Sequence, residues 1–174
     1  MPAKPQIIKD GLVVNDTWIL IKDAADAIAA EIEDQSIVPL SLWQAEQSLR
    51  RKNIGLLLDN DVDLTTISIN LKVDLNEVPV IAVNFPIFTD GRGFSIARLL
   101  RERYGYRGEI RAVGYVLRDQ LHYLKRSGFN AFSFDPANFL GTFDLVAISA
   151  SLNDFTDAYQ ISADTPTPLF RRRA

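Results

Sequence analysis

The 174-residue chain lacks cysteine altogether and contains a single histidine, His122. Without thiols it can form no disulfide, no thiolate zinc site and no cysteine-ligated iron–sulfur cluster, and thiol redox chemistry within the chain is excluded. A single histidine excludes a histidine-rich metal centre as well. No apolar run approaches the length of a membrane span, and Met1–Asp10 lacks the apolar core of a signal peptide. We therefore expect a soluble cytoplasmic protein with no membrane association, no metal site and no cofactor.

The charge balance argues against nucleic acid as a partner. The net charge is -3 and the pI is near 5.2, whereas binding to a phosphate backbone requires a basic surface. The apolar fraction of 47% and the charged fraction of 24% are typical of globular proteins, and the length fits one domain. We predict a single α/β domain over residues 1–164 and a disordered tail over 165–174, which holds two prolines and Arg171–Arg173.

The middle of the chain alternates between strand-like and helix-like patterns. The predicted strands are Ile37–Leu40, Ile54–Leu58, Val80–Phe85, Glu109–Gly114 and Ala131–Phe134, and the predicted helices include Phe94–Tyr104 and Val116–Ser127. Repeated βα units require parallel pairing with right-handed crossovers, so we expect a parallel sheet, either open or forming part of a (βα) barrel. Residues 7–21 add an N-terminal β-hairpin, whose tight turn is Asp10-Gly11. In either architecture, ligands favour the C-terminal ends of the strands.

A glycine-rich loop at the end of the strand Val80–Phe85 has the ingredients of an anion site. Its glycines let the backbone approach a ligand, the following helix opens with free N–H groups, and Arg92 adds positive charge. An alternative interpretation is that Asp90 and Ser95 cap the helix while the glycines make the turn. The loop matches neither a dinucleotide fingerprint nor a Walker motif, so it does not indicate nucleotide binding. The anion-binding candidates are Thr89, Asp90, Gly91, Arg92, Gly93 and Ser95.

Four further residues are supporting candidates. Glu109 and Arg111 share one face of their strand with Val113, so they form a structural ion pair or contact a substrate. Gln120 lies beside the apolar side of its helix and should bond to a buried group. Asp119 lies on the outer side, near a first helical turn that favours a carboxylate. Neither of these two is expected to be catalytic, and no residue is assigned a catalytic role.

The strings FTDGRGFS, ARLLRERYGYRGE, RAVG and VLRDQL, between Phe88 and Leu121, resemble a known family. It is a bacterial family of unknown function whose genes commonly lie beside assimilatory sulfite reductase. Its members are often labelled a probable oxidoreductase in sulfite reduction. The resemblance extends more loosely over Ile37–Gln160. It implies cytoplasmic sulfur assimilation as a setting, but no reaction and no catalytic residues, and no thiol, metal-cluster or dinucleotide motif supports the oxidoreductase label.

Three hypotheses follow from these observations. The first is a non-redox accessory factor in sulfite reduction that binds a small oxyanion or sulfite reductase itself. The second is an enzyme on a (βα) scaffold that acts on a small anionic substrate. Its site would combine four charged side chains, Asp90, Arg92, Glu109 and Arg111. The third is a homodimer built through the apolar surplus of the hairpin, with Trp18 and Ile19–Ile21.

Overall fold

The strands of the protein form one curled sheet. A computed structural model describes residues 5–23, 32–46, 48–49, 53–65, 74–139, 143–153, 162–163 and 165. Within them the sheet has eight strands in the order β2-β1-β8-β7-β6-β5-β4-β3, of which β3 to β8 are mutually parallel and β1 is antiparallel to both its neighbours. The strands are β1 Gln6–Lys9, β2 Leu12–Asn15, β3 Ile19–Leu20, β4 Ser36–Pro39, β5 Gly55–Leu58, β6 Val80–Phe85, β7 Glu109–Gly114 and β8 Ala131–Phe132.

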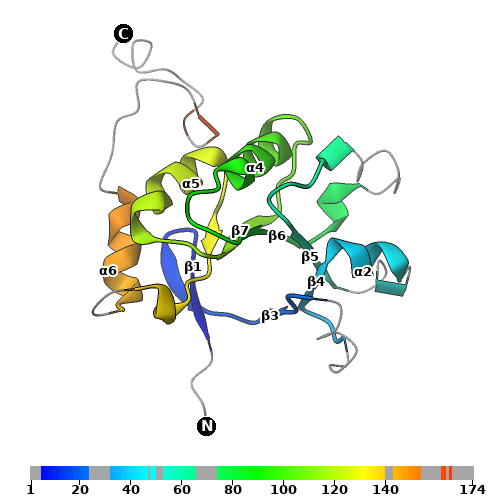
Figure 1. Ribbon diagram of the computed structural model, residues 1–174, viewed down its shortest axis with the longest axis horizontal. Coiled ribbons are helices and arrows are strands. Elements are labelled where there is room, and N and C mark those ends of the chain that lie inside the picture. The colour runs from blue at the N-terminus through cyan, green and yellow to red at the C-terminus, as the bar shows by residue number, and fades with distance from the viewer. Residues whose placement is uncertain are drawn as a thin grey trace.

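Helices cover the outer face of this sheet (Figure 1). The α-helices in the described residues are α2 Leu40–Ala45, α4 Arg92–Glu102, α5 Leu121–Ser127 and α6 Leu145–Ala150. Four short 3-10 helices accompany them, η2 Leu75–Glu77, η3 Arg118–Gln120, η4 Pro136–Asn138 and η5 Ser151–Asn153. Helix α4 packs on β6 and beside α5, α2 packs on β4 and β5, and α6 packs on the β1–β2 hairpin. Among the described residues, no helix has the length and apolar character needed to cross a bilayer.

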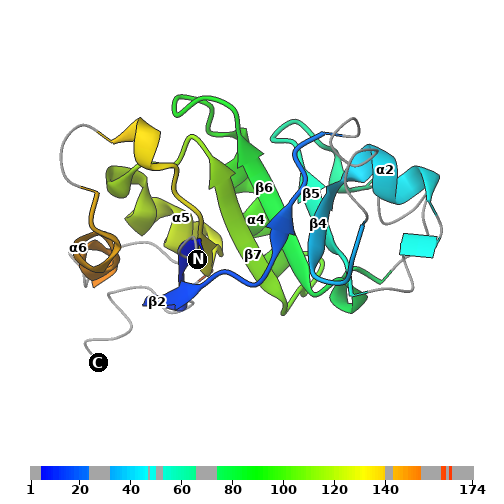
Figure 2. The ribbon, with the colours of Figure 1, turned by 90° about the horizontal axis from the view of Figure 1, so that it is seen from below.

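The sheet is a half-barrel, because its two edges curl towards each other on the inner side. The edge strands β2 and β3 are consecutive in the chain, and the segment that joins them crosses the concave face in front of the central strands (Figure 2). This segment, residues 16–18, is called the strap below. Of the two architectures left open by the sequence, the partial barrel is the one that forms.

Side chains alternate between the helix-covered outer face and the strap-covered inner face. In β7, Ile110 and Ala112 join the large core beneath the helices, whereas Val113 joins a smaller inner core. The inner core consists of Ile37, Leu57, Val80, Ala82 and Val113, with Trp18 and Leu20 packed against it from the strap side. The apolar surplus of the N-terminal segment is therefore largely used inside the molecule: Ile21 is buried, while Leu12 and Ile19 stay exposed.

The strand register arranges the inner side chains of β6 and β7 in layers. Val80 lies opposite Glu109 at the N-terminal end, Ala82 opposite Arg111 in the middle, and Asn84 opposite Val113 near the C-terminal end. The charged side chains of Glu109 and Arg111 thus lie towards the N-terminal ends of the strands, and the polar side chain of Asn84 lies near their C-terminal ends.

Candidate ligand site at the open end of the half-barrel

A pocket of about 460 Å³ opens at the C-terminal ends of the parallel strands. It is formed by residues at the ends of β3, β6, β7 and β8. Strands β3 and β8 lie far apart in the sheet order, so they reach one pocket only because the sheet curls. The described lining residues are Leu20, Lys22, Asn84, Phe85, Pro86, Val113, Gly114, Tyr115, Ser133, Phe134, Asp135, Pro136 and Asn138. This is the end at which (βα) folds bind their ligands, as the sequence analysis expects.

The wall formed by β6 and β7 depends on a glycine. Gly114 ends β7 with a φ of +90°, and a Cβ atom there would lie 2.5 Å from the Phe85 carbonyl oxygen. The close approach lets the Tyr115 amide donate to that same oxygen at 2.7 Å. Because β7 turns so tightly against β6, Tyr115 is held at the edge of the pocket rather than carried away from it.

Two charged side chains line the pocket. Lys22 follows β3 and is exposed, and no carboxylate pairs with its ammonium group in the described part of the chain. Asp135 follows β8, and its Oδ1 accepts a hydrogen bond from the Ala137 amide at 2.9 Å, which starts η4. No described cation pairs with Asp135, so neither charge neutralises the other by direct contact.

Neutral polar groups complete the lining. Asn84, Tyr115, Ser133 and Asn138 supply amide and hydroxyl groups. The Asn84 Nδ2 atom donates to Asp59 Oδ1 at 3.3 Å, which connects the pocket to the loop after β5. No group of three or more acidic or histidine side chains suited to a metal ion occurs in the described residues. The lining therefore combines two charged side chains with neutral hydrogen-bonding groups.

Exposed apolar side chains stand beside the pocket on the loop after β6. Ile87 and Phe88 are 56% and 53% exposed, and the Phe88 ring lies 5.9 Å from that of Tyr115 between centroids. Gln120 holds this loop in place, since its Nε2 donates to the Phe88 carbonyl at 2.9 Å while its Oε1 accepts from the Leu117 amide. The partners of Gln120 are thus two backbone groups on an exposed and a half-buried residue, rather than the buried group that the sequence predicts. Asp119 is exposed in η3, on the outer side where the sequence places it.

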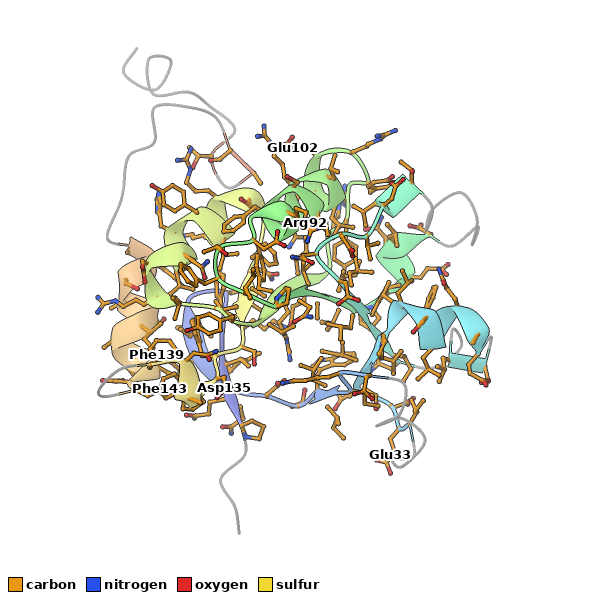
Figure 3. The ribbon with its side chains drawn as sticks, in the orientation of Figure 1. Glu33, Arg92, Glu102, Asp135, Phe139 and Phe143 are labelled. Carbon is orange, nitrogen blue, oxygen red and sulfur yellow. The ribbon has the colours of Figure 1, made fainter. Side chains whose placement is uncertain are left out.

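The predicted anion loop lies outside this pocket. The Arg92 guanidinium donates to Asp90, with Nη2 2.6 Å from Oδ2, and the Arg92 amide donates to Asp90 Oδ1 at 3.1 Å. These bonds from Arg92 lower the pKa of the Asp90 carboxyl to about 2. Asp90 thereby occupies positions that an external oxyanion would take. Figure 3 places Arg92 in the helix layer, well separated from Asp135.

The small residues of the loop have individual explanations. A Cβ atom on Gly93 would lie 2.7 Å from the Phe85 ring, so this glycine allows α4 to pack on β6. Around Gly91 the space is open, and Thr89 and Ser95 are exposed. Ser95 makes no cap bond, since α4 begins without a side-chain cap. Anion binding by Thr89–Ser95 stays a prediction, with Asp90 as an internal competitor.

Glu109 and Arg111 belong to a buried ion cluster that lies nearer the N-terminal ends of the strands than the pocket does. Arg111 Nε donates to Glu109 Oε1 at 2.7 Å, and its Nη1 donates to both oxygens of Asp16, at 3.0 and 2.9 Å. Lys9 Nζ lies 2.7 Å from Glu109 Oε2. Two cations and two carboxylates thus balance, and the Arg111 and Glu109 side chains are only 2% and 4% exposed. The interior position supports the structural ion pair rather than the substrate contact.

The four charged side chains of the enzyme hypothesis are consequently not brought together. Asp90 and Arg92 lie in the helix layer, while Glu109 and Arg111 lie inside the half-barrel, and none of them lines the strand-end pocket. Four pocket residues were not predicted from the sequence, although each stands at or near a strand end: Lys22, Asn84, Ser133 and Asn138. A cation directly after the predicted N-terminal hairpin, residues 7–21, is a signal that could have indicated Lys22.

A second cavity, of about 550 Å³, lies at the opposite end, between α5 and the β1–β2 turn. Lys125, Arg101 and Asp10 line it. The Arg101 guanidinium already donates to the carbonyls of Tyr106, Gly108 and Gly128 and to Asn130, whose amide donates to Asp10. Most of its polar lining is therefore satisfied by the protein, and we take the strand-end pocket as the candidate site.

Comparisons with known proteins confirm the resemblance to a bacterial family of unknown function, while the link to sulfite reductase stays a prediction. No curated protein sequence and no solved structure gives a significant match. The model of a family described as a bacterial protein of unknown function (DUF934) matches residues 55–170, which is two-thirds of the chain and runs from β5 past α6. The protein therefore belongs to this bacterial family of unknown function.

Proposed function

We propose that the protein is a cytoplasmic, non-redox accessory factor in sulfite reduction that binds an oxyanion in the strand-end pocket. The observation that carries the proposal is Lys22, whose ammonium group pairs with no carboxylate of the described residues. It lines a pocket that also holds hydrogen-bonding groups, apolar side chains and Asp135. A charge-assisted hydrogen bond from Lys22 to an oxyanion, supported by Asn138 or the Tyr115 hydroxyl, is the interaction that such a lining favours. The sulfur setting comes from the family resemblance of the sequence.

The binding part of the proposal is tested by calorimetric titration of the full chain with sulfite, sulfate and phosphate. Lys22→Met should weaken binding by about tenfold or more, because hydrogen bonds to charged groups contribute about 1.5–3 kcal/mol. Lys125→Met removes a lysine from the second cavity and should leave binding unchanged. Arg92→Met tests the predicted loop. A loss of binding in Arg92→Met together with normal binding in Lys22→Met would move the site to Thr89–Ser95.

The biological part is tested by deleting the gene in the bacterium that carries it. The deletion strain should fail to grow with sulfite as sulfur source and grow normally with sulfide, because the proposed step precedes sulfide. Complementation with the Lys22→Met gene should not restore growth, whereas Lys125→Met should. Co-purification of the reductase with the tagged chain tests whether sulfite reductase is the second partner. Equal growth of the deletion strain on both sulfur sources would refute the role in sulfite reduction.

A further inference from the structure

We infer that the strand-end pocket takes a small organic zwitterion, with its oxyanion at Lys22 and an amine at Asp135. The inference rests on the proposed function, since it keeps the oxyanion contact at Lys22. It adds what the oxyanion is attached to. Three features of the pocket carry it: its volume, its apolar walls and its second charge.

The volume exceeds what a bare inorganic ion fills. A sulfite ion has four heavy atoms and occupies roughly 60 Å³, about two water volumes. The pocket holds about 460 Å³, which falls in the range of sites that bind organic molecules. A bare ion at Lys22 would leave most of this space to water. The size of the pocket therefore favours a ligand with a carbon body.

The walls provide apolar surface for such a body. Phe134 is 8% exposed and Val113 is 3% exposed, so both present a fixed surface rather than a mobile one. Leu20, Pro86 and Pro136 add further carbon to the lining. Ligand sites typically combine such surfaces with a few polar groups that fix orientation. A short methylene or small ring segment would bury apolar area here.

The second charge is the carboxylate of Asp135. Its Oδ1 is engaged by the Ala137 amide, and no described cation pairs with the carboxylate. Lys22 and Asp135 line one pocket without forming an ion pair with each other. A ligand that carries only negative charge would meet repulsion at Asp135. A ligand that also carries an ammonium group would pair with both side chains.

The test uses four probes in parallel NMR titrations of the full chain: sulfite, sulfate, ethanesulfonate and taurine. Ethanesulfonate and taurine share a two-carbon sulfonate and differ in the amine. Taurine should bind about tenfold or more tighter than ethanesulfonate, the effect of one charge-assisted hydrogen bond. Asp135→Asn should abolish this preference by weakening taurine and strengthening ethanesulfonate, because the amide neither pairs with the amine nor repels the sulfonate. Asparagine also starts helices well, so η4 should be preserved. Lys22→Met should weaken all four probes.

The outcomes separate this inference from the proposed function. If ethanesulfonate binds as tightly as taurine, or if Asp135→Asn leaves the taurine preference intact, the zwitterion inference is overturned. Lys22-dependent binding of sulfite would still support the proposed function in that case. If none of the four probes binds, or if Lys22→Met changes nothing, the proposed function fails and the inference fails with it. Lys125→Met serves again as the control for the second cavity.

Discussion

Removing the guanidinium of Arg111 should destabilise the protein strongly, and the structure indicates which group causes the loss. In an Arg111→Met variant, Glu109 keeps its contact with Lys9, whose Nζ lies 2.7 Å away. Among the described residues, the Asp16 carboxylate then keeps a hydrogen bond from the Trp18 amide at 3.0 Å but no cation. Because the Asp16 side chain is 10% exposed, its carboxylate would remain buried without a cation. The predicted loss of stability should therefore come mainly from the unpaired carboxylate of Asp16 in the strap.

The expected magnitude is about 3–5 kcal/mol of unfolding free energy, the usual effect of breaking a buried ion pair by removing one partner. Domains of this kind have a total stability of roughly 5–15 kcal/mol, so the variant should retain only a modest margin. The Tm should fall by roughly 6–20 °C, at about 2–4 °C per kcal/mol for a chain of this length. Urea unfolding followed by circular dichroism measures the free energy directly.

Two further variants make this prediction refutable. Arg98→Met removes an arginine whose partner, Glu102, is on the same exposed helix face, and it should change stability by only about 0.3–0.5 kcal/mol. Adding Asp16→Asn to Arg111→Met should recover part of the loss, because the amide carries no charge to leave unpaired. A loss below about 1 kcal/mol in Arg111→Met, or no recovery in the double variant, would refute the reasoning.

Two other predictions concern the loops at the strand ends. Gly114→Ala should lower the free energy of unfolding by roughly 1–3 kcal/mol or more, because alanine at φ +90° is strained and its Cβ would meet the Phe85 carbonyl. Gly105→Ala, at φ +60° in open space, should lower it by only about 1 kcal/mol. Equal losses for the two variants in urea unfolding would contradict the packing argument. Asp90, with its pKa lowered to about 2 by Arg92, should stabilise the fold above its ordinary pKa and lose that contribution as the pH falls towards 2. NMR titration of the Asp90 carboxyl should give a midpoint near pH 2. Asp90→Asn should make stability depend less on pH between the ordinary carboxyl pKa and about 2. A midpoint at the ordinary carboxyl pKa would contradict the Arg92 contact.

Local sequence signals predicted the central strands and the turn of the hairpin. The predicted extent of the hairpin, residues 7–21, was too long, because only β1 and β2 form it while β3 pairs with β4 at the opposite edge of the sheet. Asp10 and Gly11 both have positive φ angles, 51° and 80°, as a two-residue turn of this type requires. The uninterrupted apolar run Ile54–Leu58 predicted a strand covered on both sides, and every residue of β5 is buried. Such features depend on residues close together in the chain, so a single sequence contains the information needed to infer them.

The start of the second predicted helix shows where local reasoning fails. The apolar spacing predicted a helix over Val116–Ser127, but Leu117 is extended, η3 intervenes and α5 begins at Leu121. The Gln120 side chain accepts from the Leu117 amide and donates to the Phe88 carbonyl. A contact to a distant loop thus replaces the first helical turn. The spacing of apolar residues cannot reveal such a partner.

The pocket could not be predicted either, because it too depends on contacts between segments that are far apart in the chain. Lys22 and Asp135 meet at one pocket because β3 and β8 curl towards each other, and Arg111 pairs with the strap because the strap crosses the inner face. Alternation along β7 predicted correctly that Glu109 and Arg111 share a face. It did not identify Asp16 or Lys9 as their partners, because these lie in a segment whose position depends on the curl of the whole sheet.

The layers of the interior have a consequence for mutations at its two ends. The ion cluster around Arg111 is neutral as a whole and lies beside the inner-core residues Val80 and Ala82, whereas Lys22 and Asp135 lie at the open end. A neutral cluster exerts little long-range field on a ligand at the other end, because its charges cancel over distance. Changes at Arg111 should therefore lower stability while the folded protein keeps its affinity for the ligand. Changes at Lys22, which has no ion-pair partner among the described residues, should lower affinity while stability stays the same.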